Sequence, residues 1–340
     1  QVCQHISGQL PLELHARSES ATQFVDALDL SDVKGQYQAK RVLEIAAAGG
    51  HSLLMVGPPG TGKTMLASRL SSILPEMTME EALESAAIQS ISHGDFQNSD
   101  WKKRPYRAPH HTASAVAMVG GGSTPGPGEI SLAHNGVLFL DELPEFSRQV
   151  LEVLREPLES GSISISRARG KIDFPAKFQL IAAMNPCPCG YLGDASGRCR
   201  CTEDQVQRYQ NKISGPLLDR LDMHLNVPHI DIREQFSESK QQTEKSAEVA
   251  KRVKQARQTQ YQRTGKHNAA LSGSELRSQC ALDEATRNLL FNSIEKLQLS
   301  SRAHDRILKV ARTIADLAGT ENIAMNHIAE AIGYRQLDRK

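Results

Sequence analysis

The segment Gly57–Thr64 reads Gly-Pro-Pro-Gly-Thr-Gly-Lys-Thr and follows a mostly apolar run, Ser52–Val56, that predicts a buried strand. A helix is predicted directly after it, over Met65–Leu74. Glycines let backbone N–H groups close around a phosphate without Cβ clashes. A bare Gly/Pro turn has similar letters, but the strand-loop-helix context favours a phosphate-binding loop. The sequence therefore predicts a nucleoside triphosphate site, with Lys63 facing the β- and γ-phosphates and Thr64 facing Mg²⁺.

Length and composition limit the classes of protein to which such a site can belong. A chain of 340 residues has room for about two domains. No apolar run approaches the length of a membrane span, and the N-terminus is not a secretory signal. The formal net charge is +1, so attraction to nucleic acid must be local. Aromatic residues make up 4%, which argues against base stacking as the main binding mode.

The pattern along the chain predicts an α/β fold with a parallel central sheet, because apolar strands alternate with amphipathic helices. Three domain-level segments are expected: an N-terminal linker or arm over residues 1–30, an α/β ATPase domain with inserts over 31–232, and a helical lid domain over 233–340. Two more strands are predicted at Gly136–Leu140 and Phe178–Ala183. A hairpin is predicted at Ser162–Phe174 and a loop-like insert at Ser92–Gly128. Predicted helices cover Val33–Ala48, Thr78–Ile91, Arg148–Leu158, Lys240–Arg263, Asp283–Lys296, Ser301–Leu317 and Met325–Tyr334.

Acidic and amide side chains follow two of these strands. Asp141 and Glu142 come after Gly136–Leu140, where α/β sheets present ligand-facing groups. Asp141 is expected to hold the Mg²⁺ shell, and Glu142 to orient the attacking water. Asn185 closes the next strand, where its amide would bond the γ-phosphate. The same letters also occur at ordinary strand exits and turns. The expected nucleotide-binding residues are Gly57, Pro58, Pro59, Gly60, Thr61, Gly62, Lys63, Thr64 and Asp141.

Arginines downstream are candidates to complete the site. Arg220 lies in Leu217–Asp222, a short segment leaving the α/β region, and suits insertion into a neighbouring subunit to stabilise transition-state charge. A surface ion pair with Asp219 or Asp222 is the alternative. Arg302, at the start of the predicted helix from Ser301, is expected to sense the γ-phosphate, and Arg306 one turn further on is not excluded.

In this order, the phosphate loop, Asp141-Glu142, Asn185 and Arg220 resemble the AAA+ ATPases. The segments Arg104–Thr112 and Val119–Gly122 are similar to the insert of the magnesium-chelatase-like branch. Pro188–Tyr191 and Ser214–Arg220 resemble its ComM (YifB-like) family. The resemblance covers about Leu10 to Leu337.

This resemblance implies a homo-hexameric DNA helicase that drives branch migration during natural transformation, with ATP and Mg²⁺ as cofactors and kinship to MCM helicases. It also implies an N-terminal domain related to the Lon protease fold, so this chain is expected to be the ATPase portion, with Leu10–Asp29 as the end of a linker. A magnesium-chelatase motor subunit and a protein-remodelling ATPase remain the alternatives.

The predicted hairpin Ser162–Phe174 stands where AAA+ relatives place a hairpin in the central pore. Arg167, Arg169 and Lys171 cluster at its tip, with the turn expected at Arg169–Lys171, and suit sequence-independent contacts with single-stranded or branched DNA. A solvated turn is the equal alternative. Basic residues of the other insert, including Arg104 and Arg107, predict either a second pore element or packing.

Two short motifs remain. Cys187, Cys189, Cys199 and Cys201 form two close pairs on one polar loop, a set that suits a structural Zn²⁺ tying down residues 187–201. Zinc pairs usually have at least two intervening residues and these have one, so free thiols or reversible disulfides stay open. A nucleotide hydrolase with so few cysteines is expected in the reducing cytoplasm. His110 and His111 offer possible metal ligands, but adjacent residues on a strand point to opposite faces. A structural or subunit-contact role is therefore expected for them.

Overall fold

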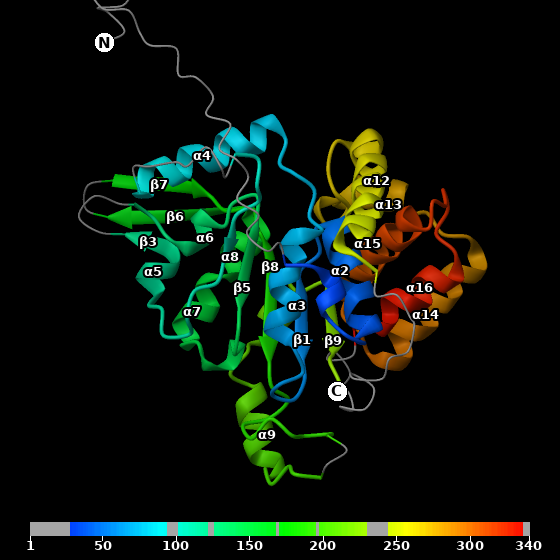
Figure 1. The fold of residues 1–340 in the computed structure, drawn as a ribbon. Helices are drawn as coiled ribbons and strands as arrows, with labels where there is room; N and C mark the ends of the chain where they lie inside the picture. The colour runs from blue at the N-terminus through cyan, green and yellow to red at the C-terminus, as the bar shows by residue number, and fades with distance from the viewer. Residues whose placement is uncertain are drawn as a thin grey trace, which may run out of the picture.

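The centre of the molecule is a five-stranded parallel sheet in the order β2-β5-β8-β1-β9 (Figure 1). The computed structural model describes residues 28–93, 101–121, 126–167, 170–194, 197–229 and 244–335. The strands are β1 (Leu53–Val56), β2 (Tyr106–Arg107), β5 (Val137–Leu140), β8 (Gln179–Met184) and β9 (Met223–Asn226). Every residue of β1, β5 and β8 is buried, as expected for parallel strands covered on both faces. The predicted α/β fold is confirmed.

Strand β1 shows how the sheet divides the core. Leu53 and Met55 join the cluster formed with α2 (Tyr37–Gly49), α3 (Lys63–Arg69) and the C-terminal helices. Leu54 and Val56 join the cluster on the other side, because successive side chains of a strand point to opposite faces. That second cluster includes residues of α5 (Ala115–Val119), α6 (Glu129–Leu132), α7 (Arg148–Val153) and α10 (Gly215–Leu218).

The C-terminal region is helical, as predicted, and packs on the α2 side of the sheet (Figure 1). Its helices are α12 (Ser246–Thr264), α13 (Gly273–Gln279), α14 (Glu284–Leu297), α15 (Ser301–Leu317) and α16 (Met325–Gly333). Helix α15 is the central one: its apolar face, from Ala303 to Ala315, is buried. Its N-cap is Ser300, whose hydroxyl accepts a hydrogen bond from the Ala303 amide.

The described residues of the segment predicted as a loop over Ser92–Gly128 contain more regular structure than expected. They include β2 and α5, which the side chain of Ser114 caps. Two-residue strands β3 (Gly120–Gly121) and β4 (Gly126–Pro127) pair after α5. Short elements held by tertiary contacts have too few residues to show a period, so the sequence pattern missed them.

Several other boundaries differ from the sequence prediction. The helix expected over Arg148–Leu158 is two helices, α7 and α8 (Arg155–Ser160), which meet at Leu154. Helix α4 spans Met79–His93, and α9 (Glu203–Gln210) begins at a capping box on Thr202. Turns of 3-10 helix cover Leu30–Asp32, Leu70–Ser72, Leu143–Glu145 and Asn268–Ala270.

The hairpin is confirmed as β6 (Ser162–Arg167) paired with β7 (Gly170–Pro175). In Figure 1 it stands beside α4, at the side of the molecule away from the C-terminal helices. Gly170 and Lys171 belong to β7 instead of the turn, because the strand pairs continue as far as Arg167 with Gly170.

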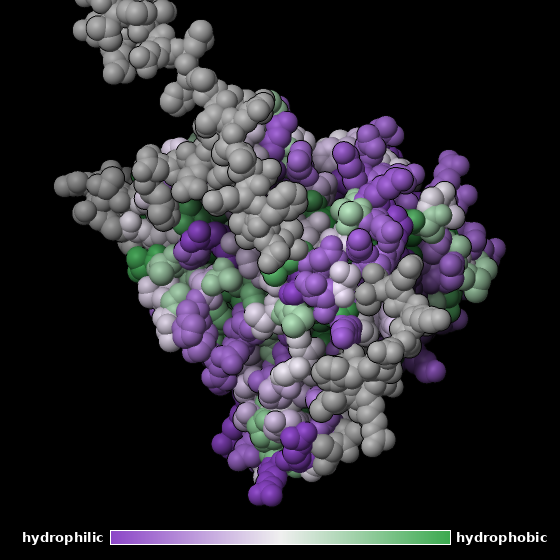
Figure 2. All heavy atoms as spheres, viewed as in Figure 1, coloured by the Kyte–Doolittle hydropathy of each residue, from purple (hydrophilic) through white to green (hydrophobic). Residues whose placement is uncertain are grey.

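One face of the molecule shows how polar and apolar side chains are distributed. Figure 2 shows hydrophilic residues over most of the face that includes α12, with hydrophobic residues scattered among them. Among the described residues, no helix is both long and apolar enough to cross a membrane.

A buried ion pair joins the helical region to the sheet. Asp222, directly before β9, is 4% exposed and pairs with Arg306 of α15. Its second oxygen accepts a hydrogen bond of 2.9 Å from the amide of Ser52, before β1. Burial alone would raise the pKa of Asp222, but the charge of Arg306, the neighbouring His51 and the Ser52 bond lower it well below the usual range.

Replacing Arg306 with methionine should therefore destabilise the fold, because it leaves the Asp222 carboxylate buried without its partner. We expect a loss of about 2 to 3 kcal/mol in urea unfolding, below the full range for buried pairs because Arg306 is 21% exposed. The lowered pKa means that this contribution holds above about pH 4 and is lost as the pH falls further.

The matched control is Arg302→Met one turn earlier. Arg302 is 58% exposed and 3.9 Å from Asp219, so its loss should cost about 0.5 kcal/mol or less. Equal losses would contradict this assignment.

Candidate functional site: a phosphate loop at the end of the sheet

The predicted phosphate loop, Gly57–Thr64, connects β1 to α3 at the carboxyl edge of the sheet. The ammonium of Lys63 donates to the carbonyl oxygens of Gly57 (2.7 Å) and Pro58 (2.8 Å). It also donates to Oδ1 of Asn185 at 3.2 Å. Burial lowers the pKa of Lys63, opposed by the nearby charges of Asp141 and Glu142. The structure thus brings Lys63 and Asn185 together from two neighbouring strands.

Two glycines give the loop its shape. Gly60 and Gly62 have φ of +77° and +83°, a region that disfavours other residues. A Cβ at either position would meet nothing within 4 Å, so their need for glycine is conformational. The space beside these two glycines is unfilled, as expected for a loop whose backbone N–H groups bind an anion.

The carboxylates lie where the sequence predicted them. Oδ2 of Asp141 accepts a 2.6 Å hydrogen bond from the hydroxyl of Thr64. A hydroxyl and a carboxylate side by side are the hard oxygen ligands that Mg²⁺ prefers. The site therefore suits a magnesium-bound triphosphate. Glu142 follows with φ of +51°, a left-handed conformation that is uncommon outside glycine and that occurs often at functional sites.

His111 is a contact that sequence reasoning missed. Its Nδ1 lies 3.3 Å from Oε2 of Glu142. The prediction that His110 and His111 point to opposite faces is wrong, because the chain turns here and their ring centroids are 4.1 Å apart. The only available signal was the pair's place in the Arg104–Thr112 motif.

Gln36 was also missed. It has φ of +51°, and its side-chain amide donates to the carbonyl of Pro228 at 3.0 Å and of Thr61 at 3.4 Å. It therefore ties the phosphate loop to the chain that leaves β9.

Arg220 and Arg302 both lie near Glu159 and Asp219. The guanidinium of Arg220 is 7% exposed, pairs with Glu159 and donates to the carbonyl of Pro216 at 2.6 Å. The alternative pairing of Arg220 with Asp219 or Asp222 is not what the structure shows. Arg302 approaches Asp219 and adds its charge near Glu159. Arg306 is committed to Asp222, which leaves Arg302 as the more accessible of the two.

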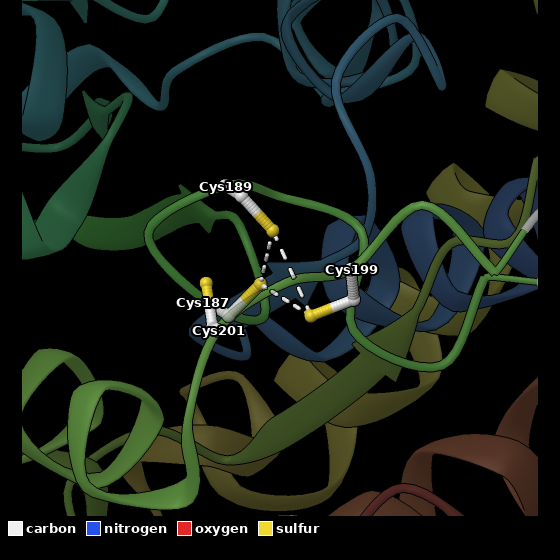
Figure 3. A group of neighbouring side chains, drawn as sticks. All are labelled: Cys187, Cys189, Cys199 and Cys201. Carbon is white, nitrogen blue, oxygen red and sulfur yellow. Dashed lines mark hydrogen bonds between the residues drawn. The ribbon is translucent and has the colours of Figure 1, made fainter.

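The four clustered cysteines converge, as Figure 3 shows. All four sulfur atoms lie within 4.8 Å of one another. Cys187 is 3.4 Å from Cys189 and 3.8 Å from Cys199, and Cys189 is 3.7 Å from Cys199. A tetrahedral zinc ion with Zn–S bonds of about 2.3 Å separates its sulfurs by about 3.8 Å. The donor set and spacing therefore fit a zinc ion, and all four thiols are free.

The predicted DNA contacts are only partly described. Lys171 is exposed on β7 and lies 3.7 Å from Asp173. Arg169 and the side chain of Arg167 fall outside the described residues.

The second basic insert serves packing in part. Arg104 donates to the carbonyls of Pro75 and Asn135, each at 2.7 Å. Arg107 makes two 2.7 Å hydrogen bonds to Glu129. Both arginines are thus engaged within the chain.

A five-stranded parallel sheet, a phosphate loop after β1, acidic residues after β5, an amide after β8 and a helical region behind define the AAA+ class of P-loop proteins. Family models agree: "Magnesium chelatase, subunit ChlI" matches residues 29–235, and its C-terminal counterpart matches residues 243–335. The chain belongs to this magnesium-chelatase-like family, and within it to the ComM/YifB-like members.

Similar proteins carry different names. The chain is 53% identical to "Uncharacterized protein YifB" of Salmonella typhimurium and 52% identical to "Competence protein ComM" of Haemophilus influenzae, over 99% of its length in each case. It spans about two thirds of those relatives (66% and 67%). "Magnesium-chelatase subunit ChlI, chloroplastic" of Glycine max is 22% identical over 61% of this chain and 44% of that protein.

Proposed function

We propose that this chain is the ATP-hydrolysing part of a homo-hexameric motor that moves single-stranded or branched DNA, promoting branch migration in homologous recombination during natural transformation. The observation that carries the proposal is the presence, in one chain, of a phosphate loop joined by Asp141 and Asn185 and of the hairpin β6–β7, whose sequence is basic near its turn. Similarity to a competence protein, and more distantly to "DNA replication licensing factor mcm6" of Schizosaccharomyces pombe (22% identical over 70% of this chain and 27% of that protein), supports the same direction.

Each residue of the site has a distinct role in this proposal. Lys63 would exchange its loop carbonyls for phosphate oxygens when ATP binds. Thr64 and Asp141 would hold Mg²⁺, which would supply positive charge to the phosphates. Glu142 takes the proton of the attacking water, and His111 fixes the orientation of the Glu142 carboxylate. Asn185 lies against Lys63 and positions the γ-phosphate.

Arg220 completes the site of a neighbouring subunit, and Arg302 senses the γ-phosphate. Head-to-tail contacts between identical subunits form a ring when the rotation between neighbours closes. In the proposed ring, each interface combines the phosphate loop of one subunit with Arg220 of the next. In this structure Glu159 holds Arg220. Arg220 must therefore exchange that carboxylate for a phosphate when it acts.

The hairpin favours DNA over the two alternatives. Arg167, Arg169 and Lys171 give it positive charge that suits phosphate contacts, and neither a chelatase motor nor a protein remodeller needs such contacts. We also propose that the four cysteines hold a structural Zn²⁺. Free thiols in the cluster and at Cys280 are consistent with the reducing cytoplasm as the place of action.

The first test concerns hydrolysis. Glu142→Gln keeps the size of the side chain but removes its basicity, so turnover should fall about 100-fold or more while ATP binding persists. Steady-state phosphate release and equilibrium binding of a fluorescent ATP analogue measure the two separately. Turnover at the wild-type rate would refute the role of Glu142 as base.

Arg220 is tested in mixed rings. Arg220→Ala alone should lower turnover about 1,000-fold or more. A ring that mixes Arg220→Ala with Glu142→Gln subunits should regain activity, because some interfaces then pair an intact Glu142 with an intact Arg220. If mixing restores nothing, Arg220 does not act across an interface.

The DNA proposal is tested on the hairpin. Forked DNA should stimulate the ATPase, and Arg169→Ala combined with Lys171→Ala should abolish that stimulation while leaving DNA-free turnover intact. Losing two contacts should lower the salt dependence of single-strand affinity by about 1.4 in log-log slope. The control is Lys254→Ala, because Lys254 is exposed on α12, which lies away from the hairpin (Figure 1). This variant should keep the stimulation by DNA. Unchanged stimulation in the double variant would rule out the hairpin as the DNA contact.

A further inference from the structure

The cysteine loop packs directly against the phosphate loop. Gly190 is buried between Cys189 and Tyr191 and has φ of +86°. A Cβ built on it would lie 2.6 Å from Cδ and 2.8 Å from Cγ of Pro59. Two segments far apart in the sequence are therefore in close contact at this point, with no room for even one methyl group.

The same loop begins at a residue of the nucleotide site. Asn185, which accepts a hydrogen bond from Lys63, is two residues before Cys187. Only Pro186 separates the Lys63 partner Asn185 from the buried thiol of Cys187. The carbonyl of Pro186, between them, accepts a 3.0 Å hydrogen bond from Gln210 of α9. The cysteine loop contacts the site on two sides, at Pro59 and at Asn185.

Turn hydrogen bonds and a cation–π contact of Arg198 with Tyr191 order parts of the loop, but few of its side chains are buried. Of its described residues between Pro186 and Cys201, only Cys187 and Gly190 are buried. A segment with so few buried apolar groups cannot offset the entropy of ordering its backbone. A metal that ties its four sulfurs together supplies that free energy, as structural zinc does in small domains.

We propose that the metal held by these four cysteines and the nucleotide held by the phosphate loop bind cooperatively, through the contact of Gly190 with Pro59 and the short link from Cys187 to Asn185. The inference rests on the zinc site proposed above and adds a regulatory consequence: occupancy of the cysteine cluster sets the affinity for ATP. Coupling of this kind is reciprocal, so bound nucleotide must raise metal affinity by the same factor.

Metal depletion and readdition test the coupling in the wild-type chain. A fluorescent, non-hydrolysable ATP analogue is titrated at fixed Mg²⁺ into zinc-loaded protein, protein stripped with a zinc-selective chelator, and stripped protein after zinc is returned. We expect stripping to weaken binding about fivefold or more, within the usual range for coupled sites, and readdition to restore it. Competition with a zinc-binding dye should show zinc affinity rising by the same factor when the analogue saturates the protein.

A matched pair of glycine variants locates the coupling. Gly190→Ala places a methyl against Pro59. Gly193→Ala, on the same loop with φ of +76°, brings the same backbone strain but meets nothing within 4 Å. Both should still bind one zinc per chain. Only Gly190→Ala should lower the affinity for the ATP analogue, about fivefold or more.

Three results would overturn the inference. Equal nucleotide affinity with and without zinc removes the coupling, and equal behaviour of the two glycine variants removes the proposed contact. Absence of zinc or cobalt(II) binding to the wild-type cluster eliminates the metal site and the coupling with it. Neither the Glu142→Gln result nor DNA stimulation depends on these outcomes, so the motor proposal stands or fails separately.

Discussion

The buried ammonium of Lys63 is the constraint around which the site is built. A buried cation is stable only where oxygen atoms replace its hydration shell. Two of those oxygens are carbonyls directly after β1, and the third is the amide of Asn185 directly after β8. The two strands are parallel neighbours in register, with Val56 opposite Met184. Adjacency of β1 and β8 in the sheet is therefore a condition for keeping Lys63 in place, and β5 on the far side of β8 then brings Asp141 to Thr64.

This dependence explains which site residues the sequence could predict. Asp141 and Asn185 were found because each directly follows an apolar strand, and the carboxyl ends of parallel strands meet at one edge. His111 belongs to an insert without hydrophobic periodicity, so no pattern placed it beside Glu142. Gly190 was similarly out of reach, since its contact with Pro59 depends on the path of an irregular loop. Most strands and long helices were predicted because they repeat a pattern, and the short elements of the insert were not.

The arginines show where a sequence motif needs burial to be interpreted. Arg302 and Arg306 lie one turn apart on α15; the sequence favoured Arg302 as the sensor without excluding Arg306. The structure separates them: Arg306 compensates the buried Asp222 charge and joins the helical region to β9, while Arg302 stays exposed. A residue that holds two regions together cannot also leave to bind a phosphate without exposing Asp222. Of these two arginines, Arg302 is therefore the accessible one.

Arg220 contacts the base of the hairpin through its ion pair with Glu159. Its partner Glu159 lies in the last turn of α8, and Gly161 alone separates α8 from β6. The hairpin is closed at this base by a 2.8 Å hydrogen bond from the Ala176 amide to the Gly161 carbonyl. The Arg220 bond holds the pKa of Glu159 below its usual range, with Arg302 and Arg155 adding to the effect. If Arg220 leaves to reach a neighbouring nucleotide, Glu159 loses its strongest partner at the point where the hairpin begins. In the proposed ring, Glu159 therefore links the movement of Arg220 at a subunit interface to the base of the proposed DNA-contacting hairpin.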